Sequence, residues 1–159
     1  MIGDERGSAA VTTIVLLPLL LIVLTAALEL GALRAIMYRA SAAADLATLV
    51  AVNDQDETEH VRTGGLLPSA DAERVARSYF ALNLAPSAPA LADPIEAIAG
   101  AADIAVFRET PATDTVTGWR YERPTVRLIA RVPVRTPAFH ALLLPSVTTV
   151  IVRAASSAR

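Results

Sequence analysis

The fold of this chain is decided by Ala9-Ala-Val-Thr-Thr-Ile-Val-Leu-Leu-Pro-Leu-Leu-Leu-Ile-Val-Leu-Thr-Ala-Ala-Leu28, twenty consecutive residues without a charge. A helix rises about 1.5 Å per residue, so this stretch reaches about 30 Å, which matches the hydrocarbon core of a bilayer. A domain of 159 residues rarely encloses a helix that is apolar on every side. We therefore predict a transmembrane helix over residues 9–33, preceded by a cytoplasmic N-terminus of residues 1–8.

The helical pattern continues beyond the apolar stretch. Residues 34–52 contain no Gly or Pro, so we expect the helix to continue from the anchor to about Val52, with a kink near Pro18. One stripe of this second half carries apolar residues at spacings of three and four, namely Ile36, Ala40, Ala43, Ala47 and Val50. A cleaved signal peptide is the alternative, because an Ala-x-Ala triplet is present at Ala40-Ser-Ala42.

Composition and charge limit the classes of function. The hydrophobic fraction is 53% and the mean hydropathy is +0.46, an excess that sits largely in the first fifty residues. The net charge is −2, which argues against a nucleic acid as partner. Cysteine is absent, which excludes disulfides, iron–sulfur clusters and thiolate zinc sites.

Residues 53–159 are expected to form an extracytoplasmic α+β domain, with one or two helices packed on a three- to four-stranded antiparallel sheet. Its helix has Ser69 as the expected N-cap, an apolar face of Ala72, Val75, Ala76, Tyr79 and Leu82, and a Glu73–Arg77 pair. A proline-rich connector follows at 85–94. Strands are predicted over 103–108, over 118–134 as one strand or two, and over 147–154, with a loop at 109–117 and an apolar helical turn from Thr136-Pro137 to Leu144.

Signs of catalysis or of a bound metal are missing. His60 and His140 are eighty residues apart and lack ligand-spaced partners, and the acidic run from Asp54 to Glu59 lacks the glycine turn of a calcium loop. No nucleophile elbow, phosphate-binding loop or dinucleotide fingerprint is present. We expect a protein without enzyme activity, cofactor or metal.

Two sets of residues are candidate contact surfaces. On the strand over 126–135, alternation places Arg127, Arg131 and Arg135 in a row on one face, which favours an open, solvated face or ion pairs with another subunit. In the anchor, the small residues Ala27, Gly31 and Ala35 recur every four positions, a pattern that lets membrane helices approach closely. Glu29 lies nearby, and either reaches the membrane interface or pairs with a neighbouring subunit.

The N-terminal region resembles a known family. The motifs Glu5-Arg-Gly-Ser-Ala-Ala-Val11, Leu17-Pro-Leu-Leu-Leu21 and Leu28-Glu-Leu-Gly31 are similar to the signature of TadE/TadG-like assembly proteins of tight-adherence (Flp) pili. Pilin-like members are cut by a prepilin peptidase after a glycine that has a glutamate as the fifth residue beyond it. Gly7 and Ser8 match that site, but Thr12 takes the place of the glutamate, so we expect slow cleavage or none.

The resemblance implies a cytoplasmic N-terminus and an external domain, although Arg34 and Arg39 follow the helix and Arg6 alone precedes it. It implies a minor pseudopilin or membrane accessory of a tight-adherence pilus or related secretion system, with the membrane, other pilus-assembly or pilin subunits and further copies of the chain as partners. The alternatives are a surface-exposed binding module, such as an adhesin or DNA-uptake subunit, and a secreted enzyme behind a signal peptide.

Overall fold

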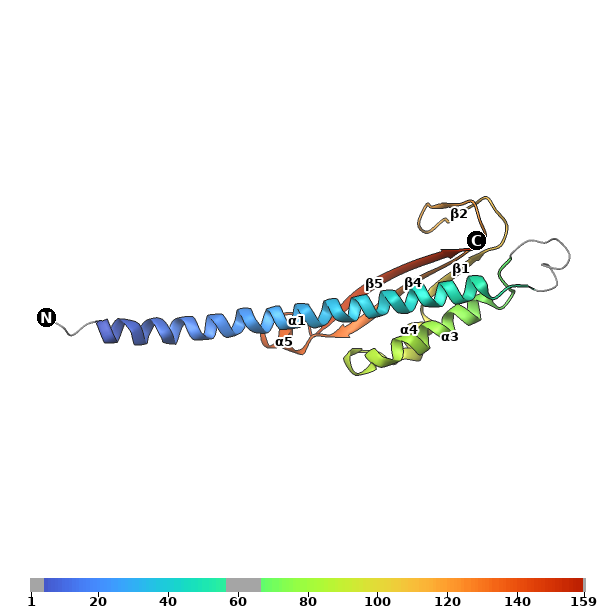
Figure 1. Ribbon diagram of the computed structural model, residues 1–159. Coiled ribbons are helices and arrows are strands. Elements are labelled where there is room, and N and C mark those ends of the chain that lie inside the picture. Colours follow the sequence, from blue (N-terminus) through green and yellow to red (C-terminus); the bar gives the residue numbers. More distant parts are fainter. Residues whose placement is uncertain (1–4, 57–66, 159) are drawn as a thin grey trace.

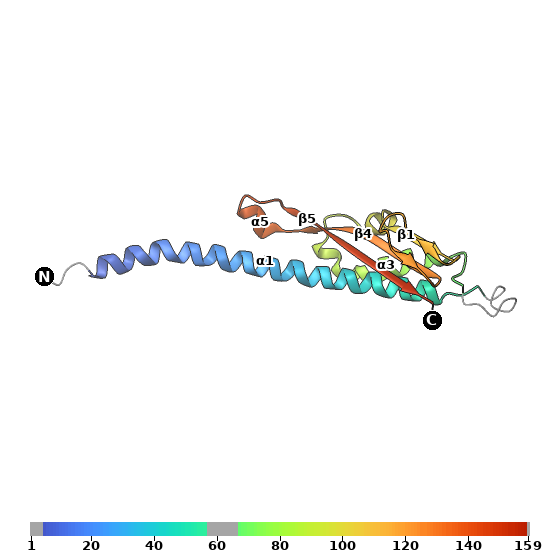
Figure 2. The same ribbon diagram turned by 90° about the horizontal axis from the view of Figure 1, so that it is seen from above.

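One helix, α1 (Glu5–Asn53), runs the length of the molecule. In the computed structural model, which describes residues 5–56 and 67–158, the N-terminal half of α1 projects alone and the C-terminal half carries the rest of the chain (Figure 1). The helix continues through Pro18, and its axis curves gently in its N-terminal third, where a sharper kink was expected (Figure 2). The apolar N-terminal stretch and the helix of the domain are thus one element.

The remaining elements form an α+β domain around the C-terminal half of α1, as the sequence predicts. In chain order they are α3 (Ala72–Leu84), the 3₁₀-helix η1 (Ala85–Ala90), α4 (Ile95–Gly100), β1 (Asp103–Phe107), β2 (Ala112–Thr113), β3 (Arg120–Tyr121), β4 (Thr125–Arg135), α5 (Pro137–Ala141) and β5 (Val147–Ser157). Strands β1, β4 and β5 make a three-stranded antiparallel sheet with β4 in the centre, and β2 pairs with β3 in a separate hairpin. The layout is pilin-like.

The core lies between α1 and the sheet. The alternation on β4 is confirmed, since Val126, Leu128, Ala130, Val132 and Val134 are all at most 1% exposed. The stripe predicted on α1 faces them: its first four members are buried and Val50 is half-buried. Alanines dominate this stripe, and their small side chains let the helix lie close to the β-branched residues of the strand.

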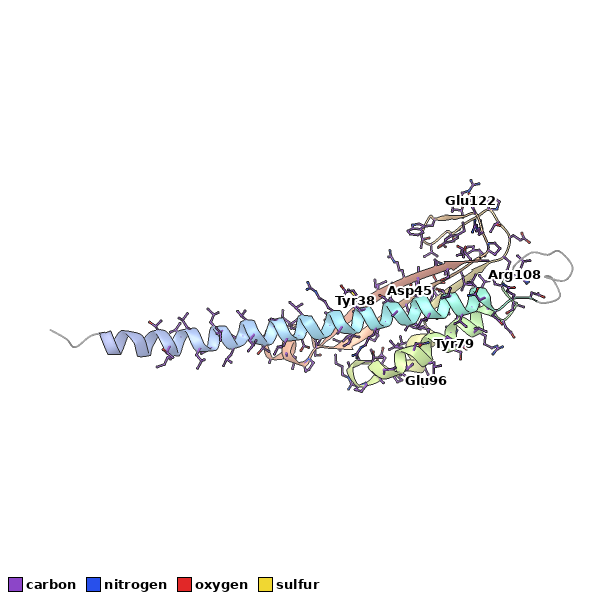
Figure 3. All side chains as sticks on the ribbon, in the orientation of Figure 1. Tyr38, Asp45, Tyr79, Glu96, Arg108 and Glu122 are labelled. Carbon is purple, nitrogen blue, oxygen red and sulfur yellow. The ribbon has the colours of Figure 1, made fainter. Side chains whose placement is uncertain are left out.

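The buried face of α3 differs from the one expected. It consists of Ala72, Ala76, Phe80 and Leu84, whereas Tyr79 and Leu82 are 41% and 67% exposed (Figure 3). The two faces share Ala72 and Ala76. Beyond Ala76, the residue that packs toward α1 is four positions on, at Phe80, and not three positions on, at Tyr79. The predicted ion pair is confirmed, with Arg77 Nη2 at 2.8 Å from Glu73 Oε1.

Ser69 is not the N-cap of α3. The helix begins at Ala72 with Asp71 in the cap position, and the Ser69 hydroxyl donates to the Asp54 carboxylate while it accepts from the Asp71 amide. These bonds join the end of α1 to the start of α3, across the segment 57–66 that lies outside the described residues. Ser69 therefore supports the junction between the two helices.

Two small elements occupy segments expected as connector or loop. The proline-rich 85–94 folds into η1 and is followed directly by α4, so that Leu91 becomes a buried core residue. Within the expected loop 109–117, Ala112 and Thr113 pair with Tyr121 and Arg120. The helical turn after Thr136-Pro137 is confirmed as α5, and β5 is three residues longer than predicted.

Candidate membrane anchor and interaction surfaces

The N-terminal half of α1 presents an uninterrupted apolar surface. Every side chain from Thr12 to Leu24 is exposed, and the large aliphatic residues from Ile14 to Leu24 keep 48–71% of their surface free, standing on all sides of the helix (Figure 3). The helix is long and apolar enough to cross a membrane once, with a mean hydropathy of 2.5 in its most apolar window. A signal sequence near an N-terminus has the same properties, so length and composition alone do not separate the two.

The domain begins to cover α1 at Thr25 and Ala26, which are half-buried. The covered face continues through Glu29 and Leu33 to the buried Ile36. Glu29 is half-buried on this face. The first ionisable residue after the apolar stretch therefore lies on the side of the helix that meets the domain.

The small residues at and beyond the end of the apolar stretch lie on the opposite side of α1. Ala27, Gly31 and Ala35 are all exposed, and a Cβ added at Gly31 would meet no atom within 4 Å. Each residue turns a helix by about 100°, so Glu29, two positions from both Ala27 and Gly31, points away from them. The structure thus keeps the stripe together as an open face and separates Glu29 from it.

The expected peptidase site lies upstream of the apolar surface. Gly7 and Ser8 are in the first turns of α1, and Thr12 follows within the same helix. The side-chain surroundings of residues 5–11 lie outside the described part of the chain. The backbone alone shows that this site and the apolar surface belong to one continuous helix.

The arginine row expected on β4 is shorter than predicted, because Arg127 is buried. Its side chain is 4% exposed and holds Asp103 in a fork, with Nη1 at 2.9 Å from Oδ2 and Nη2 at 3.3 Å from Oδ1. Its Nε lies 3.0 Å from Asp114 Oδ2 without hydrogen-bond alignment, so that contact is electrostatic. Two carboxylates neutralise Arg127, which leaves Arg131 and Arg135 as the exposed members of the row.

Asp114 organises the loop that covers Arg127. Its carboxylate accepts the Val116 amide at 3.0 Å and the Thr117 hydroxyl, and its backbone amide donates to the Trp119 carbonyl at 2.8 Å. The turn closes at Gly118, whose φ of +74° is a conformation that glycine adopts without strain. The side chain is 2% exposed, so this loop depends on one buried carboxylate.

The ionisation of Asp114 predicts a pH-dependent stability. Burial by itself raises the pKa of the Asp114 carboxyl, but the hydrogen bonds from Thr117 and Val116 and the charge of Arg127 outweigh burial and lower it. A lowered pKa in the folded state contributes stability that is complete above the unfolded value of about 3.9 and is lost as the pH falls through the folded value. We expect Asp114→Asn to destabilise the domain by about 1–3 kcal/mol at pH 7.

The measurement is the Tm of the wild-type chain and of Asp114→Asn from pH 7 down to strongly acidic pH. The difference in Tm should be constant near neutrality and shrink below pH ~4. Asp71→Asn is the control, because Asp71 and Arg74 form an exposed pair, and it should leave the Tm nearly unchanged. A difference that persists at the acid end would show that the charge of Asp114 is not responsible.

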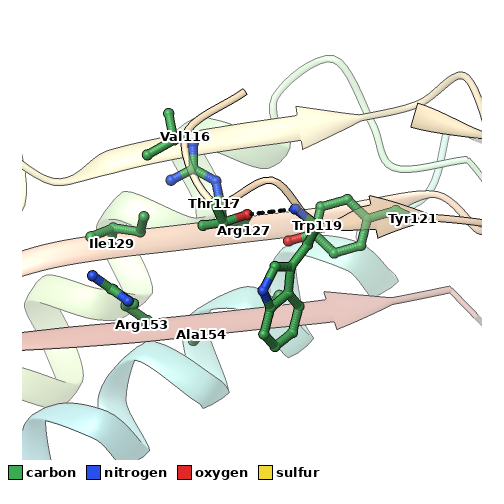
Figure 4. Close-up of a pocket in the computed structure, with 9 residues that line it drawn as sticks. Val116, Thr117, Trp119, Tyr121, Arg127, Ile129, Arg153 and Ala154 are labelled. Atoms are coloured by element: carbon green, nitrogen blue, oxygen red, sulfur yellow. Dashed lines mark hydrogen bonds between the residues drawn. The ribbon is translucent and has the colours of Figure 1, made fainter. Parts of the chain in front are cut away.

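A pocket of about 260 Å³ opens where the hairpin meets the sheet (Figure 4). Trp119, which is 67% exposed, and Arg153 form part of its lining, and the Trp119 amide donates to the Thr117 hydroxyl at 3.3 Å. Small-molecule sites usually enclose about 300–1,000 Å³. The pocket is smaller than that. The charge of Arg127, which lines it, is already compensated by Asp103 and Asp114.

The outer face of the sheet beyond the hairpin is open. Two of its cross-strand pairs place an arginine opposite an aliphatic residue, Arg131 opposite Ile151 and Arg135 opposite Val147. Arg153, opposite Ile129, belongs to the same face and was missed from sequence, although the alternation of β5 places it there. Arg131, Arg135 and Arg153 form no ion pair within the described part of the chain, so this face carries three uncompensated positive charges.

The other histidines and acidic residues that the sequence analysis considered do not form a metal site within the described residues. His140 is an exposed residue of α5, and His60 lies outside the described residues. Asp54 accepts the Ser69 hydroxyl and Asp56 pairs with Arg108 at 3.0 Å, while no three His, Cys, Asp or Glu residues of the described segments group as metal ligands would. Comparison of the chain with family models, with curated proteins and with solved structures gave no match.

Proposed function

We propose that this protein is a single-pass membrane subunit that assembles with other subunits, as a minor pseudopilin or membrane accessory of a tight-adherence pilus or related secretion apparatus. The observation that carries the proposal is the continuity of α1. Its N-terminal half has an apolar surface fit for lipid or for other helices, and its C-terminal half forms one layer of the domain core. A helix with both properties suits a subunit held in the membrane and packed laterally against neighbours.

The continuity of α1 also favours a retained anchor over a cleaved signal peptide. Processing after Ala42 would remove Ile36 and Ala40, which are 8% and 0% exposed in the core. It would also remove Leu33, which packs against the same cluster. Removal of buried aliphatic groups costs about 0.8 kcal/mol for each CH₂, so the domain is more stable with its anchor attached.

The proposed orientation places the N-terminus in the cytoplasm and the domain outside. This orientation comes from the resemblance to TadE/TadG-like proteins and not from charge, since Arg6 precedes the apolar stretch while Arg34 and Arg39 follow it. In this orientation the domain is translocated across the membrane, as in the pilin-like proteins that the N-terminal region resembles. No catalytic step and no cofactor are part of the proposed function.

A binding module is the second candidate, and the open face of the sheet favours it. Three arginines without acidic partners among the described residues lie there beside aliphatic side chains, an arrangement that complements an acidic protein surface. Under this alternative, Arg131→Ala with Arg153→Ala would abolish binding and leave assembly intact. The same face would serve a subunit contact under the leading proposal.

Close approach of a neighbouring membrane helix at the small-residue stripe is the testable core of the assembly proposal. Gly31→Ile fits the isolated chain, since nothing lies within 4 Å of the added Cβ, so an effect reports on contact between chains. The chain has no cysteine, and Leu24→Cys lies two turns before Gly31 on the same side of the helix. We expect Gly31→Ile to lower disulfide crosslinking through Cys at 24 roughly tenfold, a loss of ~1.4 kcal/mol.

Ala32→Ile is the matched control, because it places the same side chain one residue away, at an exposed position off the stripe. It should leave crosslinking and membrane insertion unchanged. If Gly31→Ile inserts normally and crosslinks as much as the wild-type background, the stripe is not part of the contact. The contact would then lie in the external domain.

A further inference from the structure

The turn between β4 and β5 ends in an exposed apolar tip. It contains α5 and the run Leu142-Leu143-Leu144, in which Leu143 is 96% exposed and Leu144 is 50% exposed. Leu143 also has a φ of +63°, a left-handed conformation that is strained for a leucine. Nothing in the described fold contacts this side chain enough to bury it, so the domain presents a leucine at the end of a strained turn.

The tip is an ordered part of the fold. The Thr136 amide donates to the Ser146 carbonyl at 2.8 Å and its hydroxyl donates to the Pro145 carbonyl at 2.9 Å, which closes the base of the turn. Inside it, the Leu144 amide donates to the Phe139 carbonyl at 2.9 Å. The turn therefore holds its leucines in a defined place.

That place is beside the middle of α1. Both ribbon views show α5 as the part of the domain that reaches farthest along α1 toward the N-terminus (Figures 1 and 2). It contacts α1, and the cover of α1 begins at Thr25 and Ala26. The uncharged stretch ends only a few residues later, at Leu28. The tip consequently lies at the level where a membrane-spanning α1 would leave the hydrocarbon core.

We propose that this tip is a second membrane contact, in which Leu143 and Leu144 enter the interface between acyl chains and headgroups of the leaflet nearest the domain. The inference rests on the proposed span of α1. Apolar side chains at this depth leave water for lipid, as in interfacial anchors. Arg34 lies six residues beyond Leu28, about 9 Å along the helix, and Arg135 precedes the turn, so both exposed guanidinium groups are placed to meet lipid phosphates.

A second contact constrains the domain in a way that one helix does not. A lone helix leaves the domain free to change its tilt against the bilayer. With the tip seated in the interface, one side of the domain faces the bilayer and the small-residue stripe, on the opposite side of α1, faces neighbouring subunits. The tip would thus set the tilt at which the subunit presents its lateral contacts.

The experiment uses the full chain in phosphatidylcholine vesicles, with single cysteines carrying the environment-sensitive fluorophore NBD. Reporters replace Leu143, Leu20 in the anchor, and Val116, which is 61% exposed on the β2–β3 hairpin, as the matched aliphatic control. Lipids with a spin label near the headgroup quench fluorophores at the interface, and lipids labelled deeper in the chain quench those in the core. We expect quenching at 143 by the shallow label to exceed that at 116 severalfold, with a blue-shifted emission at 143.

A second variant separates a lipid contact from a change in the turn. Asn accepts the left-handed conformation of residue 143, so Leu143→Asn preserves the backbone while it removes the apolar group. With the reporter at position 144, Leu143→Asn should lower shallow quenching severalfold. Unquenched reporters at 143 and 144 with a deeply quenched reporter at 20 would overturn this proposal and leave the span standing. An unquenched reporter at 20 would overturn the membrane span itself.

Discussion

A chain carrying Phe80→Ala is expected to lose about 3–5 kcal/mol of its free energy of unfolding. Phe80 is fully buried and belongs to the cluster between α3, α1 and the sheet. Its removal leaves a cavity beside the small alanines of α1, which have no side-chain rotamers with which to fill it. Small domains are stable by only about 5–15 kcal/mol, so the variant should be close to unfolding at 37 °C.

Urea unfolding of the full chain in detergent, followed by circular dichroism, measures this loss. Tyr79→Ala and Leu82→Ala are the controls, because these neighbours in α3 are 41% and 67% exposed, and each should change stability by less than about 1 kcal/mol. A loss in Leu82→Ala as large as in Phe80→Ala would mean that the face predicted from sequence, and not the one in the structure, packs against α1.

Two arginines in the anchor are expected to remove the protein from the membrane. Each of Leu17→Arg and Leu20→Arg places a charge in the middle of the uncharged stretch, at a cost of ~2.5–3.5 kcal/mol on insertion scales. Together the two substitutions oppose insertion by roughly 5–7 kcal/mol. The measurement is the fraction of the chain that resists extraction from membranes by alkaline carbonate.

The control for this variant carries two arginines elsewhere. Tyr79→Arg with Leu82→Arg alters the exposed face of α3 and should leave the extracted fraction at the wild-type level, because neither position meets the anchor or the core. Carbonate resistance that survives Leu17→Arg with Leu20→Arg would show that the chain attaches to membranes by something other than α1.

Patterns of regular period were sufficient to predict the frame of this fold. The helical pattern predicted over residues 9–52, which the structure shows as Glu5–Asn53, and the strict alternation from Val126 to Val134 reflect burial on one stripe or one face. Because each pattern repeats many times, single exceptions do not obscure it. The helix, the central strand and the α+β class therefore follow from residues alone.

Contacts between distant segments could not be predicted in the same way. By alternation alone Arg127 is one of three equivalent outward residues, and its burial depends on Asp103 and on the loop of Asp114, thirteen positions earlier in the chain. A similar ambiguity affected α3, where both i+3 and i+4 neighbours of Ala76 are apolar and the position of α1 selects Phe80. In both cases the deciding partner is set by tertiary structure.

Some features of the candidate surfaces follow from local periodicity, and others depend on tertiary structure. The small-residue stripe of Ala27, Gly31 and Ala35 depends only on helical period, so its shared face follows from spacing. Helical period also separates Glu29 from that stripe, a point that proximity in sequence obscures. The exposure of Leu143 depends on how α5 is held beside α1, which no local pattern specifies.

The central claim is that α1 is both the membrane span and one layer of the domain core, and labelling of single cysteines by a membrane-impermeant maleimide tests it most directly. In spheroplasts, Leu82→Cys should react at once, Leu20→Cys only after detergent, and Ala47→Cys, which is fully buried in the core, only after denaturation. Reaction of Leu20→Cys in intact spheroplasts would contradict the span. Reaction of Ala47→Cys without denaturant would contradict the shared helix, and Leu82→Cys that reacts only after lysis would reverse the proposed orientation.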